Sequence, residues 1–391
     1  MSQEGLPSRL YYRVCCCALF FVAASASFNG FYSKWHFREP GVAFATSSAT
    51  YGQYGFVDIV DGTASRPFVY RQLLPSIANW FDKTTPGGIK SWLYNLVAEQ
   101  DPAAAIMSGS PLAQSKTYFF RYFVVYSLTF LFAWLAVFAM YLTCRAVNLP
   151  VLTCAFAPVL MILAIPYFMS VGGYFYDYPE LAFLALAVWI SLRHSWWWLL
   201  PLVAVATWNK ESFLLMIPTL YPLLRSRYSR IATLVGTGCL CATSVLVYCA
   251  VRSRFLKNPG GAVFIEWPAQ LRYFLYPMNL MGLESTYGVV AFRAFSVVPL
   301  ALIAWTVWRG WKGVPETIRQ HAKIAAAINI PLYFLLCAPG EMRDLSLLYI
   351  AFMLLVAANL AQVERVSRGS KKQNFQVELE AGLTSVGHSL H

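Results

Sequence analysis

Two carboxylates and two guanidiniums stand close together in one polar stretch near the N-terminus. Asp58 and Asp61 are three residues apart and precede Gly62, and Arg66 and Arg71 follow. A carboxylate can deprotonate a hydroxyl nucleophile, and an arginine fork can bind a phosphate group through two hydrogen bonds. The same spacing suits a solvated turn in which an aspartate caps the next helix, so both interpretations stay open.

Three further charged pairs occur where apolar segments begin or end. They are Asp177 and Glu180, Lys210 and Glu211, and Glu341 and Arg343. The first pair flanks Pro179 and could serve as a helix cap. Ionisable groups beside apolar helices are costly at membrane depth, however, which makes a functional role the default hypothesis. Because all these groups fall on one predicted side of the membrane, we expect them to share a site with residues 58–71.

The elements that must position these groups are membrane helices. Of 391 residues, 58% are hydrophobic and only 12% are charged. Apolar runs cover residues 11–28, 119–143, 149–169, 180–192, 196–208, 213–224, 231–251, 289–308, 324–338 and 345–362. Runs of this kind predict an all-α, polytopic transmembrane bundle of about ten spans. The net charge of +12 is scattered between the runs, which argues against a nucleic-acid-binding face.

Basic residues predict the orientation of the bundle. Most basic clusters fall on one side in an alternating count of spans, so we expect both termini to be cytoplasmic. The cluster Arg252, Arg254 and Lys257 is an exception. Residues 11–28 also resemble a signal sequence, but an uncleaved first span is favoured. The protein is therefore expected to cross the membrane several times.

The predicted loops are strongly asymmetric. Residues 1–362 form a single transmembrane domain, with a long first external loop at 29–118 and a second at 252–288. Within the first loop, residues 68–81 and 89–98 have the periodicity of amphipathic helices that lie in the outer headgroup layer. The polar tail, residues 363–391, is expected to be cytoplasmic and disordered.

Cysteine and histidine contribute no visible site. All nine cysteines lie in or beside apolar runs, which is typical of small core residues and not of a disulfide framework. The five histidines are dispersed, so the sequence indicates no metal site, although a divalent metal is not excluded.

The chain resembles the GT-C superfamily of integral-membrane glycosyltransferases. The likeness lies in the long first external loop with its acidic residues, and in three short motifs. The motifs are the stretch from Asp58 to Arg71, the turn Asn209-Lys210-Glu211-Ser212 with the apolar helix and Pro218 after it, and Glu341-Met342-Arg343.

This resemblance implies a multi-pass protein of a bacterial inner membrane. It would transfer a sugar from a polyprenyl-phosphate or pyrophosphate carrier to a glycan, lipid or protein acceptor on the outer face of that membrane. Asp58 or Asp61 would act as the base in an inverting attack. Phosphate would be bound by some of four basic residues, Arg66, Arg71, Lys210 and Arg343. Asp177 and Glu180 would orient sugar hydroxyls, with Glu211 and Glu341 beside them.

Three other functions remain open from the sequence. A lipid-linked glycan flippase would also place charges at membrane depth, but it should show repeat symmetry between its halves, and none is visible. A glycan polymerase would place its large loop late in the chain. An inactive relative could act as a membrane scaffold.

Overall fold

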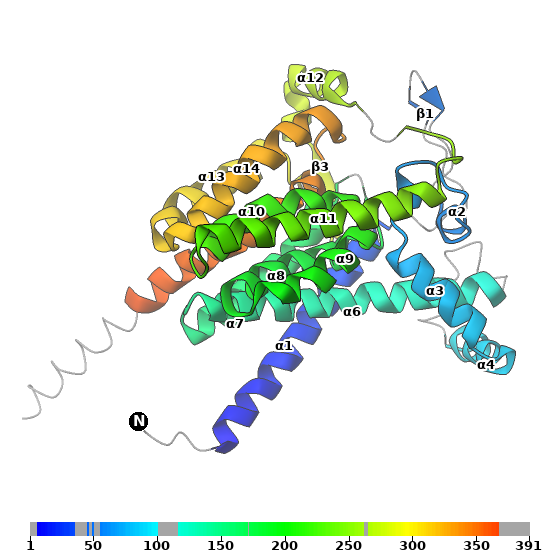
Figure 1. Ribbon diagram of the computed structural model, residues 1–391, viewed down its shortest axis with the longest axis horizontal. Coiled ribbons are helices and arrows are strands. Elements are labelled where there is room, and N and C mark those ends of the chain that lie inside the picture. The colour runs from blue at the N-terminus through cyan, green and yellow to red at the C-terminus, as the bar shows by residue number, and fades with distance from the viewer. Residues whose placement is uncertain are drawn as a thin grey trace, which may run out of the picture.

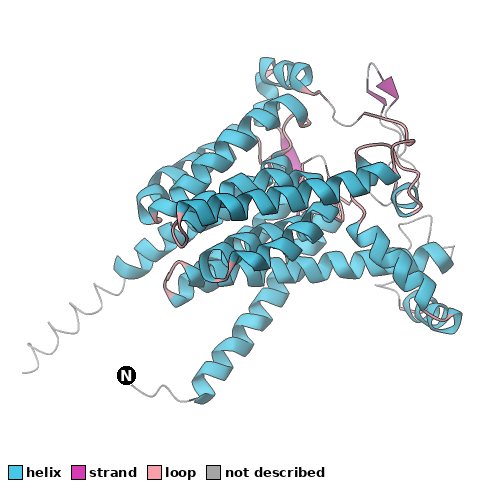
Figure 2. Ribbon diagram, in the orientation of Figure 1, coloured by secondary structure: helices cyan, strands magenta, loops and turns pink. Residues whose placement is uncertain are grey.

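The computed structural model describes residues 6–35, 45–46, 49–50, 55–100, 116–170, 172–261 and 265–366. Its α-helices are α1 (Leu6–Tyr32), α2 (Phe56–Val60), α3 (Leu73–Thr84), α4 (Gly87–Ala98), α6 (Lys116–Ala146), α7 (Val151–Phe168), α8 (Asp177–Arg193), α9 (Leu199–Asn209), α10 (Ile217–Arg225), α11 (Arg230–Arg254), α12 (Trp267–Leu275), α13 (Val297–Gly310), α14 (Glu316–Leu336) and a last helix over residues 349–366. The 3-10 helices are η2 (Phe68–Tyr70), η4 (Trp196–Trp198), η5 (Glu211–Met216), η6 (Pro277–Met281), η7 (Trp311–Gly313) and η8 (Met342–Leu348). The strands β1 (Ala45–Thr46) and β2 (Ala49–Thr50), and β3 (Leu283–Thr286) and β4 (Val289–Phe292), make two short antiparallel hairpins (Figure 2). The predicted all-α class is confirmed.

Five helical segments are long and apolar enough to cross a membrane. They are Tyr11–Tyr32, Tyr118–Ala146, Val151–Phe168, Arg230–Arg254 and Met342–Val366. The remaining predicted runs form helices that are shorter, interrupted or richer in charge. Between α9 and η5, for example, Lys210 has an extended backbone with φ −155° and ψ 125°, which ends one helix before the next begins. The structure is that of an integral membrane protein, with five such spans in the residues described.

Helix α8 lies at the centre of the bundle. Most of its side chains are buried on every face, including Ala182, Ala185 and Ala187, which have no exposed surface. A helix that is apolar all round requires protein or lipid on all sides. It packs closely along α6 and also contacts α9 and α10 (Figure 1). The acidic first turn of α8 is thereby placed inside the protein.

The segments after α1 lie at one end of the bundle. Helices α3 and α4 pack against the start of α6, at the right of Figure 1, whereas the described start of α1 lies at the opposite end. The amphipathic helix expected at residues 68–81 is divided, because η2 ends at Tyr70 and α3 starts at Leu73. Helix α4 covers the second expected helix. The parts of this loop at 36–44, 47–48, 51–54 and 101–115, and the tail at 367–391, lie outside the described residues.

The span expected at residues 289–308 begins too early. Strand β4 occupies its first residues and pairs with β3, and α13 starts only at Val297. Tyr287 and Gly288 connect the strands with positive φ angles of 58° and 75°, as a two-residue hairpin turn requires. Valine repeats fit a strand as well as an apolar helix, so composition could not separate the two.

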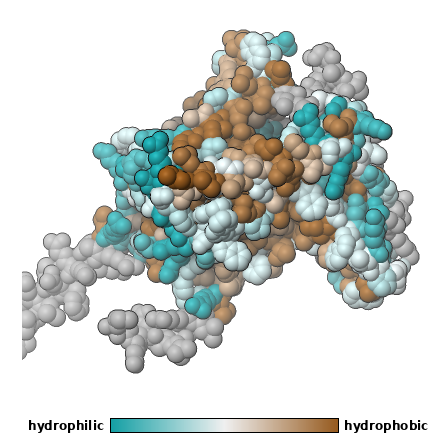
Figure 3. Space-filling view, viewed as in Figure 1, coloured by the Kyte–Doolittle hydropathy of each residue, from teal (hydrophilic) through white to brown (hydrophobic). Residues whose placement is uncertain are grey.

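The outer surface of the bundle is apolar across a wide area. Figure 3 shows this brown surface on the face crossed by α11, where Leu234, Val235 and Leu246 are exposed. On α12, Trp267, Leu271 and Leu275 are exposed at four-residue spacing, so they form one apolar face. Such a surface suits contact with lipid.

Candidate functional site

The first turn of α8 carries two buried carboxylates. Gly173 forms an isolated bridge with Trp35, and its amide donates to the Lys34 carbonyl at 2.9 Å, which holds the approach to the helix. Oδ2 of Asp177 then accepts a 2.8 Å hydrogen bond from the Tyr174 amide. Asp177 and Glu180 are only 6% and 4% exposed. The N-cap residue of α8, Tyr176, makes no side-chain capping bond in the described part of the chain, and Asp177 bonds instead to the turn before the helix.

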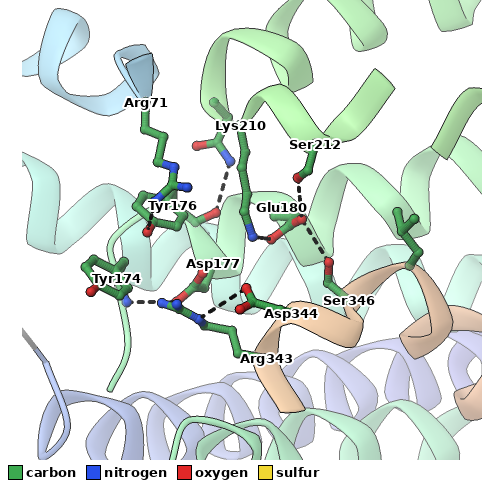
Figure 4. Close-up of polar contacts among 12 residues, drawn as sticks. Arg71, Tyr174, Tyr176, Asp177, Glu180, Lys210, Ser212, Arg343, Asp344 and Ser346 are labelled. Carbon is green, nitrogen blue, oxygen red and sulfur yellow. Dashed lines mark hydrogen bonds and ion pairs between the residues drawn. The ribbon is translucent and has the colours of Figure 1, made fainter. Parts of the chain in front are cut away.

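Lys210 reaches Glu180 from the break between α9 and η5. Its Nζ lies 2.7 Å from Oε2 of Glu180. The other oxygen, Oε1, accepts hydrogen bonds from Ser346 Oγ at 2.9 Å and Ser212 Oγ at 3.3 Å. Figure 4 shows these groups converging on one carboxylate. Both oxygens of Glu180 are thus bonded, by three residues from two separate segments.

Arg343 lies among three carboxylates. Its Nη2 is 2.7 Å from Oε1 of Glu341, and its Nη1 is 3.6 Å from Oδ2 of Asp177. Its Nε lies 3.9 Å from Oδ1 of Asp344. One guanidinium therefore neutralises three acidic groups in part.

Two tyrosines lie between two arginines in a single stack. The Tyr174 and Tyr176 rings are 5.1 Å apart with an angle of 13° between their planes. Cζ of Arg71 lies 4.4 Å from the centre of the Tyr176 ring, and Cζ of Arg343 lies 4.4 Å from that of Tyr174. Cation–π attraction of this kind is strongest where water is excluded. The stack links the segment before α3 to the start of the last span.

Arg71 also makes polar contacts. Its Nη1 donates to the Tyr176 hydroxyl, and its Nη2 lies 3.4 Å from Oε1 of Glu211. Glu211 is the more exposed partner, with 27% of its side chain accessible. The Arg71 side chain therefore stands at the outer edge of the group.

We call these residues the charge cluster. It consists of Arg71, Asp177, Glu180, Lys210, Glu211, Glu341, Arg343 and Asp344. Beside it is a cavity of about 10 Å³, lined in part by Asp177, Arg343 and Ser346. That is about the space of one water molecule. Oδ1 of Asp177 has no hydrogen-bond partner among the described residues.

Of the ten residues singled out in the sequence, seven meet in the charge cluster. The two first-loop aspartates have other partners. Oδ2 of Asp58 accepts from the Gly55 amide at 3.2 Å, which caps α2. Asp61 lies 3.1 Å from Arg121 and accepts a 2.6 Å hydrogen bond from the Tyr118 hydroxyl. Neither carboxylate bonds to the cluster in the described part of the chain.

Arg66 is the third residue outside the cluster. Its amide donates to the Pro259 carbonyl at 2.8 Å, so its backbone joins the first loop to the second. Its Nε has no hydrogen-bond partner among the residues described. In the described part of the chain this side chain shares no bond with Arg71, although both are candidates for binding phosphate.

One contact nevertheless connects α2 to the cluster. Nε2 of Gln72 donates to the Ile59 carbonyl at 3.1 Å, and Gln72 follows Arg71 directly. Ile59 lies between the two aspartates in sequence. Burial raises the pKa of the Asp58 carboxyl above its ordinary value, against the lowering effect of the Gly55 amide.

Several residues contribute to the site although the sequence assigns them no role in binding or catalysis. They are Tyr174, Tyr176, Asn209, Ser212, Asp344 and Ser346. Ser346 follows Arg343 by three residues, which places both on one helical face and could have indicated its role. The repeated tyrosines before Asp177 were a second signal.

No metal-binding geometry accompanies these groups. Within the described ranges, no three His, Cys, Asp or Glu side chains are arranged to hold a metal ion. Comparison with known proteins adds no further assignment: no family model matches the chain, and no curated protein or solved structure matches it.

Proposed function

We propose that this protein is an integral-membrane glycosyltransferase. It would move a sugar from a polyprenyl-phosphate carrier to a glycan, lipid or protein acceptor on the outer face of a bacterial inner membrane. The observation that carries the proposal is the meeting of three cations from distant segments, Arg71, Lys210 and Arg343, in one buried cluster at helix ends. Buried cations beside apolar helices suit a lipid-linked anion.

The orientation of the site supports this setting. The described start of α1 and the end of the last helix lie at the same end of the bundle, opposite α3 and α4 (Figure 1). We assign that end to the cytoplasm because basic residues flank it. The cluster then faces the outer side, where carrier-linked sugars are used.

Arg71 is the first cation that an entering phosphate would meet. Its contact with Glu211 is long, at 3.4 Å, and Glu211 is partly exposed. A phosphate can replace this carboxylate and take both guanidinium nitrogens. Lys210 and Arg343 lie deeper and would offset the charge that develops on the phosphate as it leaves the sugar.

The base is proposed to be Asp58, on α2, or Asp61, directly after that helix. Asp58 is favoured because its raised pKa makes it the better proton acceptor, while Asp61 is held by Arg121 and Tyr118. The Gln72 contact keeps α2 beside the Arg71 segment. The acceptor hydroxyl would attack the anomeric carbon as Asp58 takes its proton.

The test is sugar transfer from a polyprenyl-phosphate donor in proteoliposomes. Asp58→Asn should reduce the transfer rate by about 100-fold or more, whereas Asp61→Asn should reduce it much less. Full activity in both variants would show that neither is the base. Carrier binding without any transfer by the wild type would favour a lipid-linked glycan transporter.

Donor affinity tests the phosphate site separately. Arg71→Gln should weaken binding of the polyprenyl-phosphate donor by about tenfold or more, because a bidentate charged contact is lost. The matched control is Arg193→Gln, whose side chain bonds the Ala146 carbonyl at the other end of α8. Equal affinities in the two variants would remove Arg71 from the site.

A further inference from the structure

The charge cluster has more acids than bases. Its carboxylates are Asp177, Glu180, Glu211, Glu341 and Asp344, and its cations are Arg71, Lys210 and Arg343. With all groups ionised, five negative charges oppose three positive ones, which leaves two in excess. A phosphate would add to that excess. A site that binds an anion in this setting needs another source of positive charge.

The excess is concentrated around Arg343. Lys210 and Arg71 each pair with one carboxylate, but Arg343 alone serves Asp177, Glu341 and Asp344. In the described part of the chain, none of these three forms an ion pair with another cation. Burying an ionised carboxylate without its own partner is costly, and the usual result is that the group takes a proton.

Glu341 is the best placed of the three to take that proton. It immediately precedes the last span and is only 3% exposed. The charged and titratable groups that act on it or lie next to it are Arg343, Asp344, Asp177, Lys210 and Cys337. Burial raises the pKa of Glu341 to about 8, against the lowering effect of Arg343.

A second observation points to the same place. Oδ1 of Asp177 is buried without a hydrogen-bond partner and belongs to a residue that lines the cavity of about 10 Å³. That cavity can hold one water molecule, which would bond to the orphaned oxygen and relay a proton. Nε and Nη1 of Arg343 also lack hydrogen-bond geometry among the described residues. The group is therefore incompletely satisfied without a further ligand.

We propose that Arg343 and the three carboxylates around it, Asp177, Glu341 and Asp344, form a proton-binding site with Glu341 as the acceptor, and that the phosphate of the sugar donor binds together with this proton. Above about pH 8, where Glu341 is ionised in the free protein, the phosphate oxygens take the Arg343 guanidinium and the displaced Glu341 carboxylate forms an O–H bond with a proton from solvent. No other bond changes. One added anion and one added proton leave the net charge of the site unchanged. The coupling to phosphate rests on the proposed function, but the proton site does not.

The proton site is tested without any ligand. Because the folded pKa of Glu341 lies above its ordinary value of 4.5, the folded state holds the extra proton between the two values. The unfolding temperature of the full chain should therefore fall as pH rises from about 5 to about 8 and level off above that. Glu341→Gln should lose this pH-dependent component. Glu316→Gln, which changes an exposed glutamate at the start of α14, should retain it.

The coupling is tested with a prenyl phosphodiester in lipid nanodiscs. A diester keeps one charge over this pH range, whereas a monoester titrates near pH 6. Above about pH 8, wild-type affinity should fall by about tenfold per pH unit, and calorimetry in two buffers should show uptake of about one proton. Glu341→Gln should bind with a flat pH profile.

The outcomes separate the two proposals. A pH-dependent unfolding temperature together with no diester binding at any pH would refute the phosphate site and keep the proton site. Diester binding above about pH 8 with zero proton uptake by the wild type would refute the coupling. A flat difference in unfolding temperature between wild type and Glu341→Gln would refute the proton site. An unfolding temperature that depends on sodium concentration and not on pH would also refute the proton site. If Glu341→Gln does not fold, Asp344→Asn takes its place in the unfolding experiment, and the number of protons that the wild type takes up decides the coupling.

Discussion

Lys210→Met should be among the most destabilising single substitutions in this protein. The Lys210 ammonium lies 2.7 Å from Glu180, and both side chains are less than 10% exposed. Removing the lysine leaves Glu180 ionised in the bundle with only two serine hydroxyls. Methionine has a similar length and fills the same space, so the loss is one of charge and not of volume.

The expected cost is about 3–5 kcal/mol, the usual effect of breaking one partner of a buried ion pair. The double variant Lys210→Met with Glu180→Gln should recover about 2 kcal/mol, because the unpaired charge is then absent. Arg319→Met is the matched control. Its partner Glu316 is at 2.6 Å but more than half exposed, so the loss should be below about 1 kcal/mol.

Equilibrium unfolding in mixed detergent micelles, followed by tryptophan fluorescence, measures all four proteins. A Lys210→Met loss no larger than that of Arg319→Met would refute the assignment of a strongly coupled buried pair. A double variant less stable than Lys210→Met would refute the reasoning about the unpaired carboxylate.

Three further results are expected. Asp82→Asn removes a carboxylate shared by Lys90 and Arg121 at 2.7 and 3.0 Å and should cost about 1–2 kcal/mol in unfolding assays. Burial raises the pKa of Asp82, but the bonds to Lys90 and Arg121 outweigh it and lower this pKa. The stability that Asp82 contributes should therefore be lost only as pH falls below the ordinary pKa of 3.8, which acid unfolding would show. Gly310→Ala would place a Cβ 2.6 Å from the Leu355 carbonyl oxygen and should lower the unfolding temperature, whereas Gly88→Ala meets nothing within 4 Å and should raise it slightly.

The helical class and the long apolar spans could be predicted because they depend on local composition. Uncharged runs of about 20 residues need a bilayer or a large core wherever they occur. The short runs were harder to assign. The break at Lys210 and the hairpin before α13 depend on backbone conformation, and apolar residues occur in all of these structures.

The membership of the charge cluster followed from one physical rule. Charged side chains at the ends of apolar segments on one side of a membrane pair with each other, because contact with lipid is costly. Individual partners could not be derived in the same way. The sequence paired Asp58 and Asp61 with Arg66 and Arg71, but Asp61 bonds to Arg121, which lies 60 residues later in the chain. Such pairings depend on how helices pack.

The order in which the residues of the charge cluster occur along the chain has a consequence for biosynthesis. Asp177 and Glu180 are synthesised with α8, but Arg343 and Ser346 follow 166 residues later. Until the last span inserts, α8 carries acids without their full set of partners, and its packing into the bundle is less favourable. The last span therefore acts as the closing step of assembly. A chain truncated before residue 343 should be recognised by membrane proteases as incomplete, even though every earlier helix is present.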